Sequence, residues 1–72
     1  MKALKISARN ALKGKVLEVH HGAVNSEIML ELPGGTVITS IITKTSAENL
    51  HLKEGMEVYA VIKASNVMIA TD

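Results

Sequence analysis

Two short segments at opposite ends of the chain each place a long cation beside a small hydroxyl residue and an alanine. The first is Ile6-Ser7-Ala8-Arg9-Asn10 and the second is Ile62-Lys63-Ala64-Ser65. The side chains of Arg9 and Lys63 carry only hydrogen-bond donors, and a serine hydroxyl can donate as well. Neither segment contains a carboxylate. Donors of this kind suit an oxyanion, which offers only acceptors, so the sequence predicts an oxyanion site built from both segments.

The same residue types also have ordinary structural roles, which stay open at this point. Arg9 could be a solvated surface cation, and Lys63 could be a strand-edge residue whose aliphatic stem covers apolar surface. His20 and His21 could suggest a transition-metal site, but adjacent residues of a strand point to opposite faces. An exposed turn is therefore the preferred interpretation of the histidines, and no metal held by direct ligation is predicted.

Length and composition indicate a chain that needs support from other copies. With 72 residues it is predicted to be one domain, residues 1–72. A domain this short buries little of its surface, and small domains usually add disulfides, metals or partner subunits. The chain contains no cysteine, while 47% of its residues are hydrophobic. Self-association is the remaining route by which this apolar surface can be covered.

Charge and aromatic content argue against several classes of function. The formal net charge is +1, and Tyr59 is the single residue among Phe, Trp and Tyr. Nucleic-acid-binding domains usually carry a basic stripe, and single-strand binders stack bases on aromatic side chains. No apolar run reaches the roughly 18 residues of a membrane span, and no secretory signal is recognisable. No nucleophile–base pair is evident either, so we expect a cytoplasmic binding protein that is not an enzyme.

Alternation of apolar and polar residues predicts a chain made mainly of short strands. The strands are expected at residues 2–8, 15–21, 24–32, 36–43, 57–64 and 67–70. Asn10 and Gly14 would bracket a turn, and Pro33-Gly34-Gly35 would close a hairpin. Within 24–32, one face is predicted to be core; it carries Val24, Ser26, Ile28, Leu30 and Leu32.

One short helix is predicted between the later strands. Thr45-Ser46-Ala47-Glu48 matches the capping-box pattern, with Thr45 at the N-cap and Glu48 at N3, and the helix would end near Leu50. Greek-key barrels of the OB type place a helix in this position, and closing a barrel removes exposed strand edges. The predicted fold class is therefore an all-β, OB-like Greek-key β-barrel of five to six short strands with one short helix.

The ordered set of motifs resembles the molbindins, the small molybdate-binding proteins whose domain also occurs in molybdate-responsive regulators and transporter ATPases. The opening signature is Ser7-Ala8-Arg9-Asn10, followed by Leu12-Lys13-Gly14-Lys15-Val16. The later matching segments lie, in order, at residues 22–27, 34–35, 38–43, 50–55 and 60–69. The chain departs from the family pattern at Ala11, where a polar residue is common, and at His20-His21, where lysine is frequent.

The resemblance implies a protein that binds molybdate or tungstate. It also implies a homo-oligomer, typically a hexamer built from dimers, with oxyanions held at subunit interfaces. Carried over position by position, the main site would use Ser7, Ala8, Arg9, Thr43, Ser46, Lys63 and Ala64. The family has a second class of interface site, whose residues the sequence does not place.

Two other functions compete with oxyanion binding. An OB-type domain could bind nucleic acid, but that would require a basic, aromatic face. The chain could also be a structural assembly module without a ligand. A ligand that binds only the folded state raises its stability, so melting with and without molybdate distinguishes this last alternative from the first.

Overall fold

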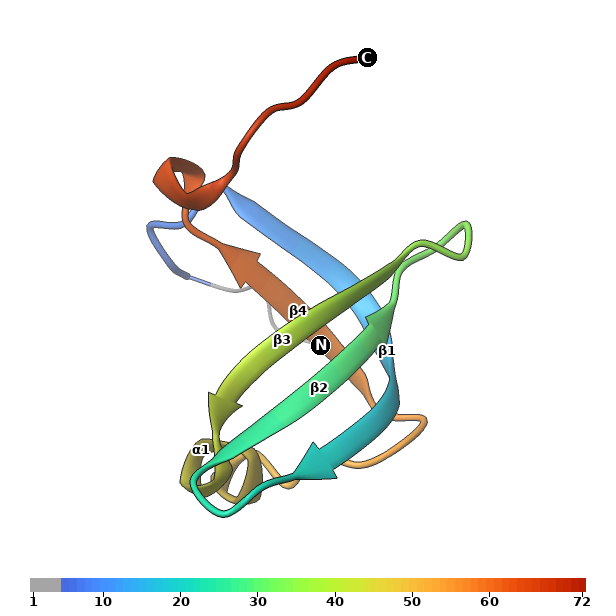
Figure 1. The fold of residues 1–72 in the computed structure, drawn as a ribbon, viewed down its shortest axis with the longest axis vertical. Helices are drawn as coiled ribbons and strands as arrows, with labels where there is room; N and C mark the ends of the chain where they lie inside the picture. Colours follow the sequence, from blue (N-terminus) through green and yellow to red (C-terminus); the bar gives the residue numbers. More distant parts are fainter. Residues whose placement is uncertain (1–4) are drawn as a thin grey trace.

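The computed structural model describes residues 5–72, which form one antiparallel sheet and two short helical segments (Figure 1). The elements follow in the order β1 (Asn10–His21), β2 (Asn25–Glu31), β3 (Val37–Thr43), α1 (Lys44–Asn49), β4 (Glu57–Ile62) and the 3-10 turn η1 (Ala64–Asn66). The strands lie in the sheet in the order β3-β2-β1-β4. Three consecutive strands with a fourth returning beside the first is the Greek-key arrangement.

The long strand β1 is the centre of the sheet and pairs with a different neighbour along each half. Residues 10–15 pair with β4, and residues 15–21 pair with β2. Gly14 is buried at the change of partner, where an added Cβ would lie 3.1 Å from the Glu31 carbonyl oxygen. A register shift between Val16 and Glu18 follows. Glycines and bulges permit sharp bends in a strand, so β1 can curl the sheet into a half-barrel.

The core lies on the concave side of this half-barrel, under α1. Val16, Ile28, Leu30 and Ala47 are buried there, each no more than 4% exposed. The alternation along β2 is therefore confirmed, since Ser26, Ile28 and Leu30 are buried. Val24 is an exception to the predicted core face. It precedes β2 in the turn and is 72% exposed.

The helix begins two residues earlier than the capping-box pattern predicts. Thr43 is the N-cap residue, and its hydroxyl accepts a hydrogen bond from the Ser46 N–H over 3.0 Å. Thr45 instead lies within the first turn. The Thr43–Ser46 pair has the same cap-to-N3 spacing as the expected Thr45–Glu48 pair, so the predicted N-cap was wrong by two residues.

The predicted strands at the two ends of the chain are wrong wherever the structure describes them. Residues 5–8 form no strand, and residues 2–4 lie outside the described part. Asn10 and Gly14 lie within β1 rather than bracketing a turn, and β4 ends at Ile62. Residues 67–72 form no strand and extend away from the body of the molecule (Figure 1). Residues 5–72 thus contain four strands instead of five or six.

Candidate functional site

The two donor-rich segments meet at one end of the half-barrel. The last rung between β1 and β4 pairs Asn10 with Ile62, so the residues just before β1 lie beside those just after β4. Together they line a pocket of about 420 Å³. Its lining consists of Ile6, Ser7, Ala8, Arg9, Lys63, Ala64 and Ser65. Five of the seven residues proposed from the family resemblance therefore share one pocket within a single copy of the chain.

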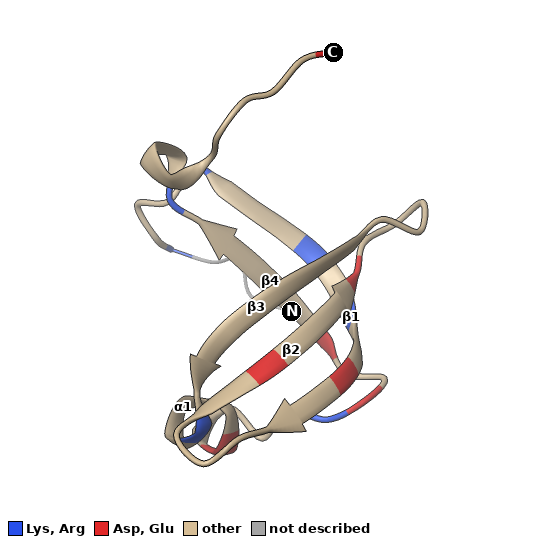
Figure 2. Cartoon of the chain, viewed as in Figure 1, with Lys and Arg blue, Asp and Glu red and all other residues tan. Residues whose placement is uncertain are grey.

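The electrostatic character of this pocket favours an anion. Its lining contains two cations, Arg9 and Lys63, and no carboxylate. Between residues 5 and 72, the two ion pairs join Lys13 to Glu57 and His20 to Glu18, so neither pocket cation is neutralised by a carboxylate in those residues. Figure 2 shows cations in both segments around the pocket, whereas acidic positions of β1 and β2 lie farther along the sheet.

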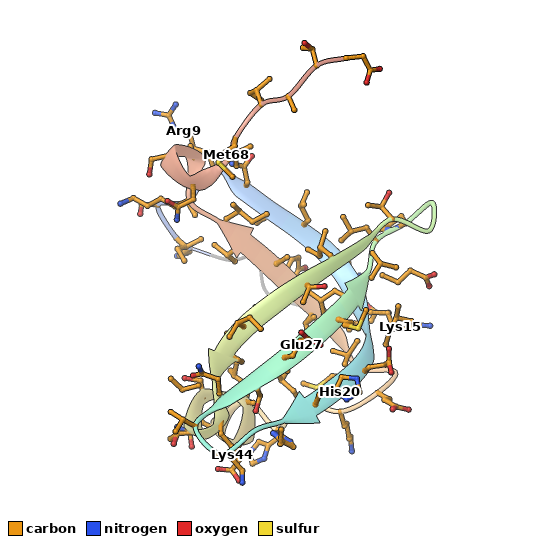
Figure 3. The ribbon with its side chains drawn as sticks, viewed as in Figure 1. Arg9, Lys15, His20, Glu27, Lys44 and Met68 are labelled. Atoms are coloured by element: carbon orange, nitrogen blue, oxygen red, sulfur yellow. The ribbon has the colours of Figure 1, made fainter. Side chains whose placement is uncertain are left out.

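Both cations are exposed, and the pocket is open on its outer side. Arg9 and Lys63 are exposed, and Ala8 is half-buried. In Figure 3 the Arg9 side chain lies beside η1 and points away from the sheet, toward the same end of the molecule as Met68. One copy of the chain would therefore contact an anion in this pocket from one side only.

The remaining two proposed residues, Thr43 and Ser46, lie at the other end of the molecule. Thr43 pairs with Asn25 at the start of β2, beside the hairpin that follows the end of β1. The pocket lies at the beginning of β1. Since β1 has 12 residues, its ends are separated by about 35 Å along the strand at roughly 3.3 Å per residue. Figure 1 shows α1 and η1 at opposite ends of the half-barrel.

This separation has a direct chemical consequence. Hydrogen bonds to an oxyanion require donor–acceptor distances of about 2.7–2.9 Å. Within one copy of the chain, the Thr43 and Ser46 hydroxyls cannot reach an anion bound by Arg9 and Lys63. If all seven residues contact one anion, at least two copies of the chain must contribute to each site.

A second, larger cavity lies in the concavity of the half-barrel. It measures about 600 Å³ and opens between the unpaired edge strands β3 and β4. Its lining is mainly apolar and includes Ile38, Leu52, Met56, Val58 and Tyr59. The sequence predicted excess apolar surface but did not locate it. The period of two identifies which side chains of each strand point inward. It does not show that the barrel is open between β3 and β4, because that depends on where the strands end.

The described part of the chain contains neither a cluster of metal-ligating side chains nor a helix that could span a membrane. Across residues 5–72, no group of three or more histidine, aspartate or glutamate side chains could hold a metal ion. Among the same residues, neither α1 nor any other helix has the length and apolar character needed to cross a bilayer.

Known proteins are similar to this chain over most of its length. The TOBE domain family matches residues 6–69. Molybdenum-pterin-binding protein 3 of Clostridium pasteurianum is 54% identical over 66 residues, covering 92% of this chain and 97% of the relative. A probable molybdenum-pterin-binding protein of Haemophilus influenzae is 42% identical over 69 residues, covering 96% of this chain and all of the relative.

Solved structures of molybdate-binding and Mop proteins have the same fold as this chain. MopII from Clostridium pasteurianum superposes with a TM-score of 0.89 at 52% identity, covering 93% of this chain and all of that one. The cytoplasmic molybdate-binding protein ModG, solved with molybdate bound, has a TM-score of 0.86 at 52% identity. There the match covers 90% of this chain but 46% of that chain. The OB-like all-β fold class is confirmed, as is the prediction of a binding protein rather than an enzyme. The chain belongs to the TOBE domain family and, within it, to the molbindins, the small Mop-like proteins.

Proposed function

We propose that this protein binds molybdate at sites shared between copies of the chain, and that it stores or buffers the anion in the cytoplasm. The observation that carries the proposal is the pocket in which Arg9 and Lys63 lie without a carboxylate in the lining. The names of the relatives support molybdate as the ligand, and the cytoplasmic relative ModG supports the location. Tungstate, another tetrahedral dianion, is proposed as an alternative ligand of the same site.

Each proposed residue has a distinct task in this site. Arg9 and Lys63 balance the two negative charges, and charge-assisted hydrogen bonds are roughly twice as strong as neutral ones. The Ser7 hydroxyl adds a further donor. Among residues 5–72, the N–H groups of Ala8 and Ala64 make no hydrogen bond to a backbone acceptor outside the strands and helices, and we assign them as further donors to the oxyanion. Their small side chains permit a close approach.

The other side of the anion is assigned to a neighbouring copy, which would supply Thr43 and Ser46. Within one copy the Thr43 hydroxyl donates to the Ser46 hydroxyl oxygen over 2.8 Å. The Ser46 hydroxyl thus accepts from Thr43 and keeps its own hydrogen for another acceptor. Both side chains are exposed, so a second copy can reach them.

The shape of the protomer also supports a homo-oligomer, proposed here to be a hexamer built from dimers. The apolar cavity is open between the edges of β3 and β4. The segment after η1, residues 67–69, carries exposed apolar side chains. Val67, Met68 and Ile69 are 47%, 91% and 84% exposed. We assign this extended segment to the cavity of a second copy, because an added strand would pair a free edge and cover the apolar lining.

Calorimetric titration with molybdate, tungstate and sulfate tests the proposed ligand. Arg9→Ala and Lys63→Ala are each expected to weaken molybdate binding about 10- to 100-fold, since hydrogen bonds to charged groups contribute about 1.5–3 kcal/mol. Lys53→Ala, which removes an exposed cation from the turn before β4, is the matched control. Unchanged affinity in both pocket variants would remove the proposed site.

Native mass spectrometry tests the proposed assembly in the same samples. It is expected to report a hexamer, with bound anions that depend on Arg9 and Lys63. A monomer that binds molybdate as tightly as the assembly would contradict the sharing of sites. A gel shift with single-stranded oligonucleotides distinguishes the alternative of nucleic-acid binding, because tight binding there would overturn the assignment.

A further inference from the structure

One side-chain hydrogen bond joins the two segments that form the oxyanion pocket. Asn10 Nδ2 donates to the Ile62 carbonyl oxygen over 3.3 Å, and both residues are half-buried. Asn10 directly follows Arg9, and Ile62 directly precedes Lys63. The bond therefore connects the residue next to one pocket cation with the residue next to the other. Asn10 belongs to the opening signature Ser7-Ala8-Arg9-Asn10 but is not among the seven proposed site residues.

The segment before β1 has few other connections to the sheet. Among residues 5–72, no backbone hydrogen bond outside the strands and helices involves residues 5–9. The ladder between β1 and β4 begins at the Asn10–Ile62 pair itself. Within the described chain, the Asn10 side chain thus reinforces the last rung before Arg9, at the position where fraying of the strand end would begin.

The chemistry of an amide fits this position better than that of a carboxylate. Arg9 and Lys63 carry like charges on the two segments, and the bond from Asn10 to Ile62 joins the segments next to both cations. A carboxylate at position 10 would form an ion pair with a neighbouring cation and compete with the anion for it. The amide of Asn10 donates to a backbone carbonyl without adding charge, which leaves both cations available to the ligand.

We propose that Asn10 is a positioning residue for the oxyanion pocket, which fixes Arg9 relative to Lys63 through its bond to the Ile62 carbonyl. The proposal rests on the proposed function only because it assumes that the pocket binds an oxyanion. The connection between the two segments can be measured without any ligand. Asn10 does not itself line the pocket, so its effect on affinity is exerted through the placement of its neighbours.

Molybdate affinity measured by calorimetry is the first test. Asn10→Ala is expected to weaken binding about fivefold, the equivalent of one hydrogen bond of about 1 kcal/mol. Asn10→Gln retains an amide donor and is expected to recover part of the loss. Asn49→Ala, which removes an exposed asparagine at the end of α1, is the matched control. Full affinity in Asn10→Ala would overturn the proposal.

A double-mutant cycle separates positioning from a general structural role. If Asn10 acts by placing Arg9, the Asn10→Ala change should cost much less affinity in an Arg9→Ala background than in the wild type. Equal costs in the two backgrounds would contradict the proposal. Should Asn10→Ala fail to fold, Asn10→Thr takes its place, because threonine suits a strand and its hydroxyl is too short to reproduce the bond.

Amide hydrogen exchange of the ligand-free protein gives a readout that does not depend on molybdate. Asn10→Ala is expected to accelerate exchange at the hydrogen-bonded amides of the terminal rungs between β1 and β4, residues 10–12 and 60–62, while exchange in β2 and β3 stays as in the wild type. Unchanged exchange in these rungs would overturn the bracing role. If the wild type does not bind molybdate at all, the proposed function fails, and this measurement still decides whether Asn10 joins the segments.

Discussion

Thr43 and Ser46 hold each other at the start of α1 by two hydrogen bonds. The Thr43 hydroxyl accepts from the Ser46 N–H over 3.0 Å and donates to the Ser46 hydroxyl oxygen over 2.8 Å. This pair caps the helix and orients the Ser46 hydroxyl, whose own hydrogen remains available to an acceptor. It lies at the opposite end of β1 from the pocket of Arg9 and Lys63. The proposed site is thus divided between two ends of the protomer.

This division predicts that two defective variants will restore binding when they assemble together. Arg9→Ala damages the cationic half of every site, and Ser46→Ala damages the hydroxyl half. In a mixed assembly some sites receive Arg9 from one copy and Ser46 from the other, so both halves are intact. We expect refolded mixtures to bind molybdate with near wild-type affinity at about one quarter of the sites, since random pairing combines the halves independently.

The mixture must be compared with each variant refolded alone, and calorimetry reports the number of tight sites directly. A mixture of Arg9→Ala with Lys63→Ala is the matched control. Arg9 and Lys63 line the same pocket, so both changes affect the cationic half of the site. Every copy in this mixture lacks one of the two cations, and no pairing of copies can supply both to one site. Restoration in the control, or none in the test mixture, would contradict sharing of the site between copies.

Much of the sheet could be predicted from local patterns, because burial along β2 and β3 follows a period of two. The alternation that buries Ile28 and Leu30 also fixes the side of the sheet that carries the core. The residues that line the proposed oxyanion pocket could be predicted from residue types, since two cations without a carboxylate are recognisable in sequence. Its two segments then meet because antiparallel pairing brings Asn10 opposite Ile62.

The sequence predictions were wrong at positions whose structure depends on contacts with distant parts of the chain. Leu4 and Ile6 alternate with polar residues in the manner of a strand, yet residues 5–8 have no strand partner within the described chain. Gly14 was interpreted as part of a turn because glycine commonly marks turns. It instead lies where β1 changes partners, which depends on two other strands. Likewise, the position of Thr43 and Ser46 relative to the pocket follows only from the complete topology.

Gly14→Ala is expected to destabilise the protein although the position lies in an ordinary strand. An added Cβ would lie 3.1 Å from the Glu31 carbonyl oxygen and 3.2 Å from Leu32 Cδ2. Overpacking of this kind typically costs about 1–3 kcal/mol, and here one neighbour is backbone and cannot rotate away. Urea unfolding measures the loss. Ala11→Ser, at an exposed position in the same strand, should change stability by less than about 0.5 kcal/mol.

The exposed ion pair between Lys13 and Glu57 predicts a dependence of stability on alkaline pH. Lys13 Nζ lies 3.0 Å from Glu57 Oε2, and this hydrogen bond, followed by the charge of Glu57, raises the pKa of Lys13 above its ordinary 10.5. A raised pKa in the folded state means that the contribution is complete below pH 10.5 and is lost as pH rises through the folded value.

We therefore expect the difference in melting temperature between wild type and Lys13→Gln to stay constant up to about pH 10 and to shrink above it. The difference is small because both side chains are exposed to solvent. Lys53→Gln, an exposed lysine in the turn before β4, has no ion pair among the described residues and should give no such trend. A difference that grows above pH 10.5 would contradict the assignment.

Removal of residues 67–72 is expected to abolish assembly while leaving the strands able to form. The segment extends from η1 and carries Met68 and Ile69, which are 91% and 84% exposed. Burying such a side chain contributes about 1.5–3 kcal/mol, so losing both should weaken association at least about 100-fold. Native mass spectrometry measures the assembly, and Met68→Leu, which keeps the apolar volume, should preserve it.

The location of the segment can be followed through Tyr59, which lines the apolar cavity and is the chain's one aromatic residue. If the segment of a second copy fills that cavity, deleting it exposes the phenol ring, and iodide should quench tyrosine fluorescence more strongly. Ile69→Asp should have the same effect, because a carboxylate cannot be buried there without a partner. If the truncated chain keeps both its assembly and its protected Tyr59, some other surface must join the copies. The open cavity would then be available to a ligand of its own.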